Sequence, residues 1–174
     1  MTIADGSSPP KRAPLFGGNG TTTYGDLTWF SASEIMKSVG KDLPDYGEFA
    51  VLAYGVKEAS SIGTEPPSVV LDALRTSKWG IVQATGNMWV WCRDFNFIPS
   101  GADFTALTTA SYKSVTGGRG QVYAYGSYGL CAAIFGGYWN NGSISGSRAS
   151  SWNISPWDSY SSIGARGRSD HLAY

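Results

Sequence analysis

Residues 86–95 read Gly86-Asn87-Met88-Trp89-Val90-Trp91-Cys92-Arg93-Asp94-Phe95, with large apolar side chains at both odd and even positions. Successive side chains of a strand point to opposite faces, so this pattern predicts a strand covered on both sides. A second apolar run fills residues 130–135 and ends at Gly136-Gly137. We expect strands at 88–93 and 130–135. Shorter strands are expected at 81–82 and at 121–125, the latter after a glycine-rich turn at 117–120.

Two helices are expected before this strand. Ser31 and Glu34 fit a capping box, and the apolar stripe that follows ends at Gly40. A second helix is expected to begin at Pro44 or Asp45. Its apolar residues recur at helical spacing and are predicted to be core: Tyr46, Phe49, Leu52, Ala53 and Val56. Pro66-Pro67 breaks any helix in that region, and residues 68–77 are compatible with one short turn. The pattern predicts an α+β domain with two N-terminal helices, short antiparallel strands and long ordered loops.

The composition is that of one globular domain. The chain has 174 residues, of which 23 are Gly and 7 are Trp, and its formal net charge is zero. No basic run indicates nucleic-acid binding, and no stretch reaches the ~20 apolar residues that span a bilayer. Residues 1–22 are interpreted as a flexible arm or linker and residues 23–174 as the domain. No secretory signal is visible near the N-terminus, although removal of a leader stays open.

Cys92 and Cys131 both lie in apolar runs, which favours buried free thiols over a disulfide. Two cysteines and one histidine, His171, are too few for a four-ligand zinc site. We predict no metal and no cofactor.

The C-terminal segment has an unusual alphabet. From residue 122 onward it contains no Lys, Glu, Gln, Met or Thr, and it is rich in Ser, Gly, Tyr, Trp and Asn. Evolved binding surfaces have this composition, because Tyr and Trp give rigid contact area and Ser, Gly and Asn give adaptable hydrogen bonds. Loop-rich β proteins with buried Trp anchors and no ligand have it too. An AAC codon with both adenines randomised encodes fifteen residues, among them Asn, Ser, Tyr, Asp, Ile, Ala and His, but never Lys, Glu, Gln, Met or Trp. The segment fits that restriction, apart from its Trp positions.

Three motifs in order carry a resemblance. They are the Gly86–Trp91 strand, the run Phe135-Gly136-Gly137-Tyr138-Trp139-Asn140-Asn141-Gly142, and the run Ile163-Gly164-Ala165-Arg166-Gly167-Arg168-Ser169-Asp170-His171. Gly146-Ser147-Arg148, Trp152 and Ser155-Pro156 lie between the last two. Over roughly residues 24–174 the chain resembles the variable proteins of diversity-generating retroelements. These have a C-type-lectin-like fold of the formylglycine-generating-enzyme branch.

The resemblance implies a hypervariable ligand-binding face at about residues 135–171, whose codons are rewritten by adenine-directed mutagenic reverse transcription. It implies phage host attachment or cell-surface recognition, and a location in the virion (phage tail) or at the cell surface. The implied partner is a protein or glycan ligand on a target surface, with no nucleic acid, no membrane insertion and an open oligomeric state. The implied ligand-binding positions are Tyr138, Asn140, Asn141, Ile144, Ser145, Ala149, Ser151, Asn153, Ile154, Asp158, Tyr160 and Ser162. The three Asn residues are either variable positions or backbone caps. The implied scaffold positions are Gly136, Gly137, Trp139, Arg148, Trp152, Gly164 and Arg166, with both arginines expected to be buried donors.

Three other functions compete with this one. An oxidoreductase like the formylglycine-generating enzyme needs a reactive cysteine pair in the C-terminal half, and only Cys131 is there. A calcium-dependent lectin needs Glu-Pro-Asn or Gln-Pro-Asp together with Trp-Asn-Asp, and none of these occurs. An invariant structural virion domain would share the fold and lack the diversity. We therefore expect a binding protein and not an enzyme.

Overall fold

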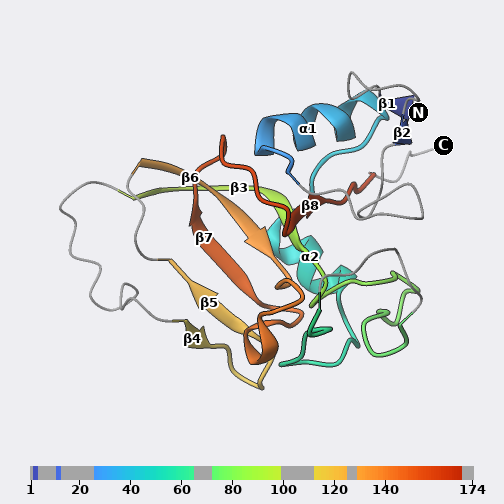
Figure 1. Cartoon of the computed structure of the whole chain (residues 1–174), viewed down its shortest axis with the longest axis vertical. Helices are drawn as coiled ribbons and strands as arrows, with labels where there is room; N and C mark the ends of the chain where they lie inside the picture. The colour runs from blue at the N-terminus through green and yellow to red at the C-terminus, as the bar shows by residue number, and fades with distance from the viewer. Residues whose placement is uncertain are drawn as a thin grey trace.

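The computed structural model describes residues 2–3, 11–12, 26–64, 72–98, 112–124 and 129–169. Two helices and a central sheet form the described part (Figure 1). Along the chain the elements are β1 (Thr2–Ile3), β2 (Lys11–Arg12), α1 (Trp29–Ser38), α2 (Tyr46–Leu52), β3 (Trp89–Ile98), β4 (Lys113–Ser114), β5 (Gln121–Tyr123), β6 (Gly129–Phe135), the 3₁₀ turn η1 (Gly142–Ile144), β7 (Ser150–Ile154) and β8 (Ile163–Ala165).

The main sheet has six strands in the order β4-β5-β7-β6-β3-β8. The prediction of antiparallel strands is wrong for two pairs, since β3 with β8 and β5 with β7 are parallel. Each parallel pair includes one strand that was not predicted, β8 in the first pair and β7 in the second. The strand predicted at 81–82 is also wrong, because Val82 lies in a turn and Ile81 has no regular secondary structure.

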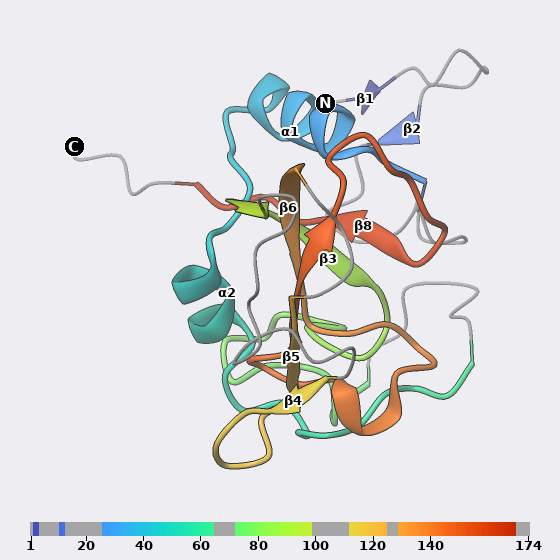
Figure 2. The same ribbon diagram turned by 90° about the vertical axis from the view of Figure 1, so that its left-hand side faces the viewer.

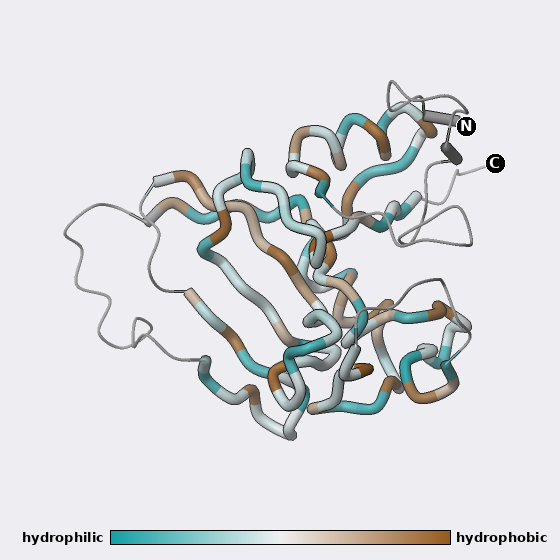
Figure 3. Tube along the Cα trace, viewed as in Figure 1, coloured by the Kyte–Doolittle hydropathy of each residue, from teal (hydrophilic) through white to brown (hydrophobic). Residues whose placement is uncertain are grey.

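Strand β3 is covered on both sides, as predicted. Its neighbour β6 is antiparallel to it, and a register shift lies between Trp91 and Phe95. Side chains of both strands alternate between two cores that we name after the helix that covers each. The α1-side core contains Leu27, Ala32, Met36, Leu43, Trp89, Trp91, Ala132, Ile134, Ala149, Ile163 and Ala165. The α2-side core contains Phe49, Ala53, Val56, Ala84, Val90, Cys92, Ala133 and Phe135. Figure 3 shows the hydrophobic β6 running through the middle of the sheet.

The helix predicted near Trp29 is confirmed, but its cap is not. Thr28 is the N-cap, and its side chain accepts a hydrogen bond from the Ser31 amide. Ser31 therefore lies inside the first turn, and the capping box predicted for Ser31 and Glu34 is wrong. The sequence offered two hydroxyl residues three positions apart, and the turn uses the first. Gly40 follows the helix with φ +70°, the left-handed conformation predicted for it.

The second helix follows its prediction closely. Asp45 is the N-cap of α2 and forms a reciprocal capping box with Glu48. Phe49, Ala53 and Val56 are buried, while Tyr46 and Leu52 pack against the same core. The predicted apolar stripe is therefore core.

The N-terminal arm is described only at two short strands, which pair antiparallel. The remaining arm residues, Pro66-Pro67 and His171 lie outside the described residues. The short turn considered for 68–77 is described only from residue 72, where 73–75 form a turn. No helix among the described residues is long and apolar enough to cross a membrane.

Candidate ligand-binding face

The backbone of Gly136 forms hydrogen bonds to both ends of the site, to Gly86 before β3 and to two residues just before β7. Its carbonyl accepts hydrogen bonds from the amides of Gly86 and Gly146, both at 3.2 Å, and its amide donates to Ala149 at 3.0 Å. Its φ is +97°, and an added Cβ would lie 2.9 Å from the Phe49 ring. Only glycine fits this junction without strain, which agrees with its predicted scaffold role.

The loop after β6 is held by residues from the segment between α2 and β3. The amide of Trp139 donates to Asn87 O at 3.1 Å. Its carbonyl accepts from the Gly63 amide at 2.7 Å and from the Ser61 hydroxyl at 2.8 Å. The loop backbone is therefore fixed by main-chain bonds, and these bonds do not depend on the side chains that the loop carries.

The three asparagines have different roles. The Asn141 side chain accepts the Tyr138 amide at 2.9 Å, while the Asn141 amide donates to Tyr138 O at 3.0 Å. Asn141 is thus a backbone cap. Asn140 is exposed. Asn153 is half-buried and accepts the Ser151 hydroxyl at 2.6 Å.

The two scaffold arginines behave differently. Arg166 is buried and donates to the carbonyls of Val82 and Gln83 at 3.0 and 3.3 Å, as predicted. Burial lowers the pKa of its guanidinium. Arg148 is exposed, so its predicted burial is wrong. The neighbouring Ser147 is the residue that ties this loop to a carboxylate, because its amide donates to Glu58 at 2.8 Å.

Most predicted ligand-binding positions lie on one side of the sheet. Tyr138, Ile144 and Ile154 pack against the α1-side core. Ser151 lies opposite Ile134 of that core, and directly paired residues share a face. In Figure 2 the sheet is seen edge-on, with α2 on one side and η1 and the β7–β8 loop on the other.

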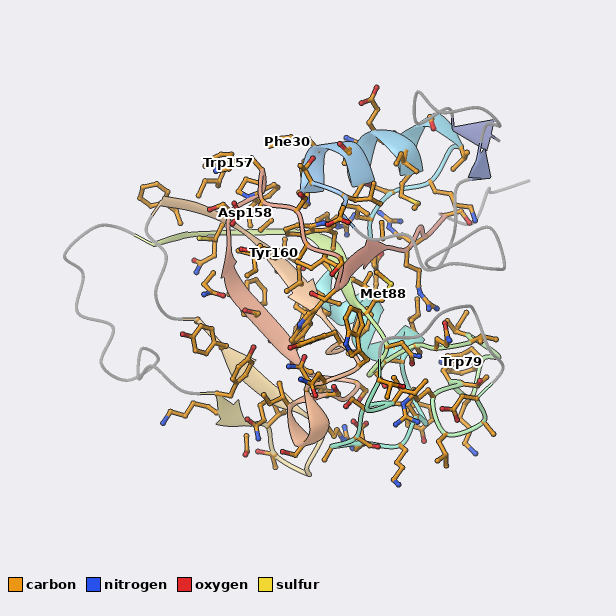
Figure 4. All side chains as sticks on the ribbon, in the orientation of Figure 1. Phe30, Trp79, Met88, Trp157, Asp158 and Tyr160 are labelled. Carbon is orange, nitrogen blue, oxygen red and sulfur yellow. The ribbon has the colours of Figure 1, made fainter. Side chains whose placement is uncertain are left out.

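The β7–β8 loop, residues 155–162, presents large side chains on a fixed backbone. The Trp29 amide donates to Pro156 O and the Asp26 amide to Tyr160 O, both at 2.9 Å. Trp157 is 61% exposed and Tyr160 48% exposed. Figure 4 shows both along this loop with Asp158.

Three of the twelve predicted positions do not reach the surface. Ser145 and Ala149 are fully buried and Ser151 is 3% exposed. Their side chains offer a ligand no surface in this conformation, because loop and core atoms enclose them. The other nine are half-buried or exposed: Tyr138, Asn140, Asn141, Ile144, Asn153, Ile154, Asp158, Tyr160 and Ser162. We call these nine positions, with Trp157, the variable face.

Known proteins are similar to this chain in sequence and in fold. No model of a known protein family matches the chain. A tail fiber receptor-binding protein of Bordetella phage BPP-1 is 44% identical over 181 aligned residues, which cover 99% of this chain and 44% of that protein. The solved M1 and U1 variants of the major tropism determinant match with TM-scores of 0.67 and 0.63 at 42% and 43% identity. Those matches cover 100% and 96% of this chain, and 45% and 44% of the determinants.

The chain is a homologue of the major tropism determinants. It spans less than half the length of the curated relative and of the solved determinants that it matches. The predicted α+β, C-type-lectin fold is confirmed by the likeness to the tropism determinants.

Two tyrosines that sequence reasoning missed lie beside the variable face of this tropism-determinant homologue. Tyr123 is paired with Ser151 through the parallel β5–β7 register. Tyr112 stacks near it, with ring centroids 4.8 Å apart. Burial raises the pKa of Tyr112, and the nearby Tyr123 and Tyr138 raise it further. No sequence signal identifies this cluster, because it depends on the register between β5 and β7.

The two thiols are buried and free, as predicted. Burial raises the pKa of Cys92 well above its ordinary value and also raises that of Cys131, with a smaller contribution from Asp158. Neither is therefore poised as a nucleophile. Within the described ranges, no group of three His, Cys, Asp or Glu side chains could hold a metal ion.

Proposed function

We propose that this chain is the receptor-binding part of a phage tail fibre, and that the variable face contacts the receptor on the target cell. The observation that carries the proposal is the 44% identity to a tail fiber receptor-binding protein across nearly the whole chain. The receptor is a protein or glycan on the target surface, and the chain acts in the virion.

We further propose that the positions of the variable face other than Trp157 are diversified by adenine-directed mutagenic reverse transcription. The hydrogen bonding of the loop backbones supports this proposal. The loop backbones are held by main-chain bonds through Gly136, Trp139, Pro156 and Tyr160. Side chains on a backbone held in this way can change at small cost in stability, because the bonds that position the loop persist.

The function proposed is binding and not catalysis. The names of the relatives describe receptor binding and tropism. The high pKa values of the buried thiols also remove the cysteine chemistry that an oxidoreductase of this fold class would need.

An adsorption-competition assay tests the proposal. Purified chain in excess should block adsorption of the source phage to its host. The double variant Trp157→Ala/Tyr160→Ala should lose that competition, whereas Leu74→Ala should retain it, since Leu74 is 52% exposed and lies outside the variable face. Equal competition by both variants would remove the β7–β8 loop from the receptor site. No competition by the unmodified chain would remove the receptor-binding role.

A further inference from the structure

A second concave site lies on the α2 side of the sheet. It is a cavity of about 650 Å³ between α2, the segment that carries Trp79, and two loops that carry Arg119 and Arg148. This volume is in the range of small-molecule sites. Figure 4 shows Trp79 well away from Trp157 and Tyr160. The residues that line the cavity include none of the variable face.

One wall of this cavity is aromatic. Trp79 is 63% exposed and Tyr54 is 60% exposed, with ring centroids 6.5 Å apart. The Trp79 indole N–H donates to Val51 O at 2.8 Å, which holds the ring in place. A large exposed ring held by its polar end presents an apolar face to a ligand at little entropy cost.

The other wall is cationic. The Arg148 amide donates to Arg119 O at 2.9 Å. This hydrogen bond holds the backbones of the two arginines side by side. Neither guanidinium has a hydrogen-bond or ion-pair partner among the residues that the structure describes. Glu58 is the acidic residue of the lining, and its two carboxylate oxygens already accept from Ser147.

We propose that this cavity is a second ligand site, and that it binds an acidic saccharide. The C–H face of a pyranose ring stacks on Trp79 and Tyr54. A carboxylate on the sugar pairs with Arg119 and Arg148, because the guanidinium fork matches a carboxylate in a two-point contact. The two walls of the cavity thus supply the apolar and the charged contacts that a uronic acid requires.

An NMR titration with trigalacturonate, set against its methyl ester, tests this site. The ester keeps the rings and lacks the charge. We expect the acid to shift the Trp79 indole N–H resonance, which is assigned by its loss in Trp79→Phe. The affinity should fall at least tenfold for the ester and for Arg119→Gln/Arg148→Gln. Both arginines are exposed, so this variant should keep its melting temperature.

Two controls separate this proposal from the receptor-binding one. Lys37→Gln removes a positive charge on α1 and should leave trigalacturonate binding unchanged, as should Tyr160→Ala. No shift with the acid, or equal binding of acid and ester, would overturn the site. So would concentration-dependent dimerisation that Trp79→Ala abolishes, since a second copy of the chain would then occupy the cavity. None of these results bears on adsorption competition.

Discussion

Gly137 packs directly against Ser145, and an added Cβ on Gly137 would lie 2.7 Å from the Ser145 Cα. Gly137 also has φ +84°. The loop that carries Tyr138 and the loop that follows η1 are therefore in van der Waals contact through a residue without a side chain. This contact holds the start of the β6–β7 connection against the residues that follow η1 in the same connection.

Gly137→Ala should accordingly lower the free energy of unfolding by more than about 2 kcal/mol, because strain in φ adds to a backbone clash. Gly142→Ala is the matched control. Gly142 has φ +54°, and an added Cβ would meet nothing within 4 Å, so we expect a loss of about 1 kcal/mol. Urea denaturation measures both. Equal losses would show that the loops do not pack as described.

Trp152→Ala should destabilise the fold by about 3 kcal/mol. The indole packs edge-on against Phe135 with centroids 5.6 Å apart and donates to the Ser150 hydroxyl at 2.9 Å. It lies on the α2-side core, away from the variable face. Thermal unfolding followed by circular dichroism is the measurement, and an unchanged melting temperature would exclude Trp152 as an anchor.

Tyr160→Ala should behave in the opposite way. The side chain is half exposed, and its backbone carbonyl makes the structural bonds to Asp26 and Ile163. We expect an unchanged melting temperature and about 30-fold weaker binding to host cells, since an interface hot spot contributes about 2 kcal/mol. Unfolding of the variant would mean that the ring is structural.

The Asp45 cap should make stability depend on pH. Its hydrogen bond from the Glu48 amide, followed by the contact with Arg93, lowers the pKa of Asp45. Because the pKa of Asp45 is lower in the folded than in the unfolded protein, its charged form stabilises the fold above pH about 4. This stabilisation is lost as the pH falls through the pKa of Asp45 in the folded protein. Asp45→Asn keeps a cap and removes the charge. The difference in unfolding free energy between the two proteins should shrink between pH 7 and pH 3. A constant difference would contradict the charge effect.

Cys92 and Cys131 should react with dithionitrobenzoate only after unfolding, because burial raises the pKa of both thiols. Absorbance of the released thiolate before and after addition of guanidinium counts them. Rapid reaction of the folded protein would show that one thiol is accessible.

Features that depend on the spacing of residues close together in the sequence could be predicted. The two apolar faces of β3, the stripe of α2 and the buried thiols could be predicted because each depends on nearby spacing. The cap of α1 was predicted at Ser31 instead of Thr28, because both residues are good caps and local spacing does not distinguish them. Strands β7 and β8 were missed, because Ser150 and Gly164 lack β-strand character and gain their conformation from pairing with β6 and β3.

The candidate site, too, could be predicted only in part from the sequence. Its position along the chain followed from composition and from the resemblance to the variable proteins. The burial of Ser145, Ala149 and Ser151 and the exposure of Arg148 depend on how distant loops pack, which spacing does not encode. Tyr112 and Tyr123 join the face only through the β5–β7 register.

Deep sequencing of codons 135–171 in a population of the source genome, with a search for a nearby template repeat, tests the central claim most directly. Adenine-directed diversification predicts variation at the accessible positions, among them Tyr138, Asn140, Ile144, Asp158 and Tyr160, each aligned with an adenine-containing codon of the template. Gly136, Gly137 and Arg166 should not vary. An invariant segment without a template repeat would contradict the claim and leave a receptor-binding domain of fixed sequence.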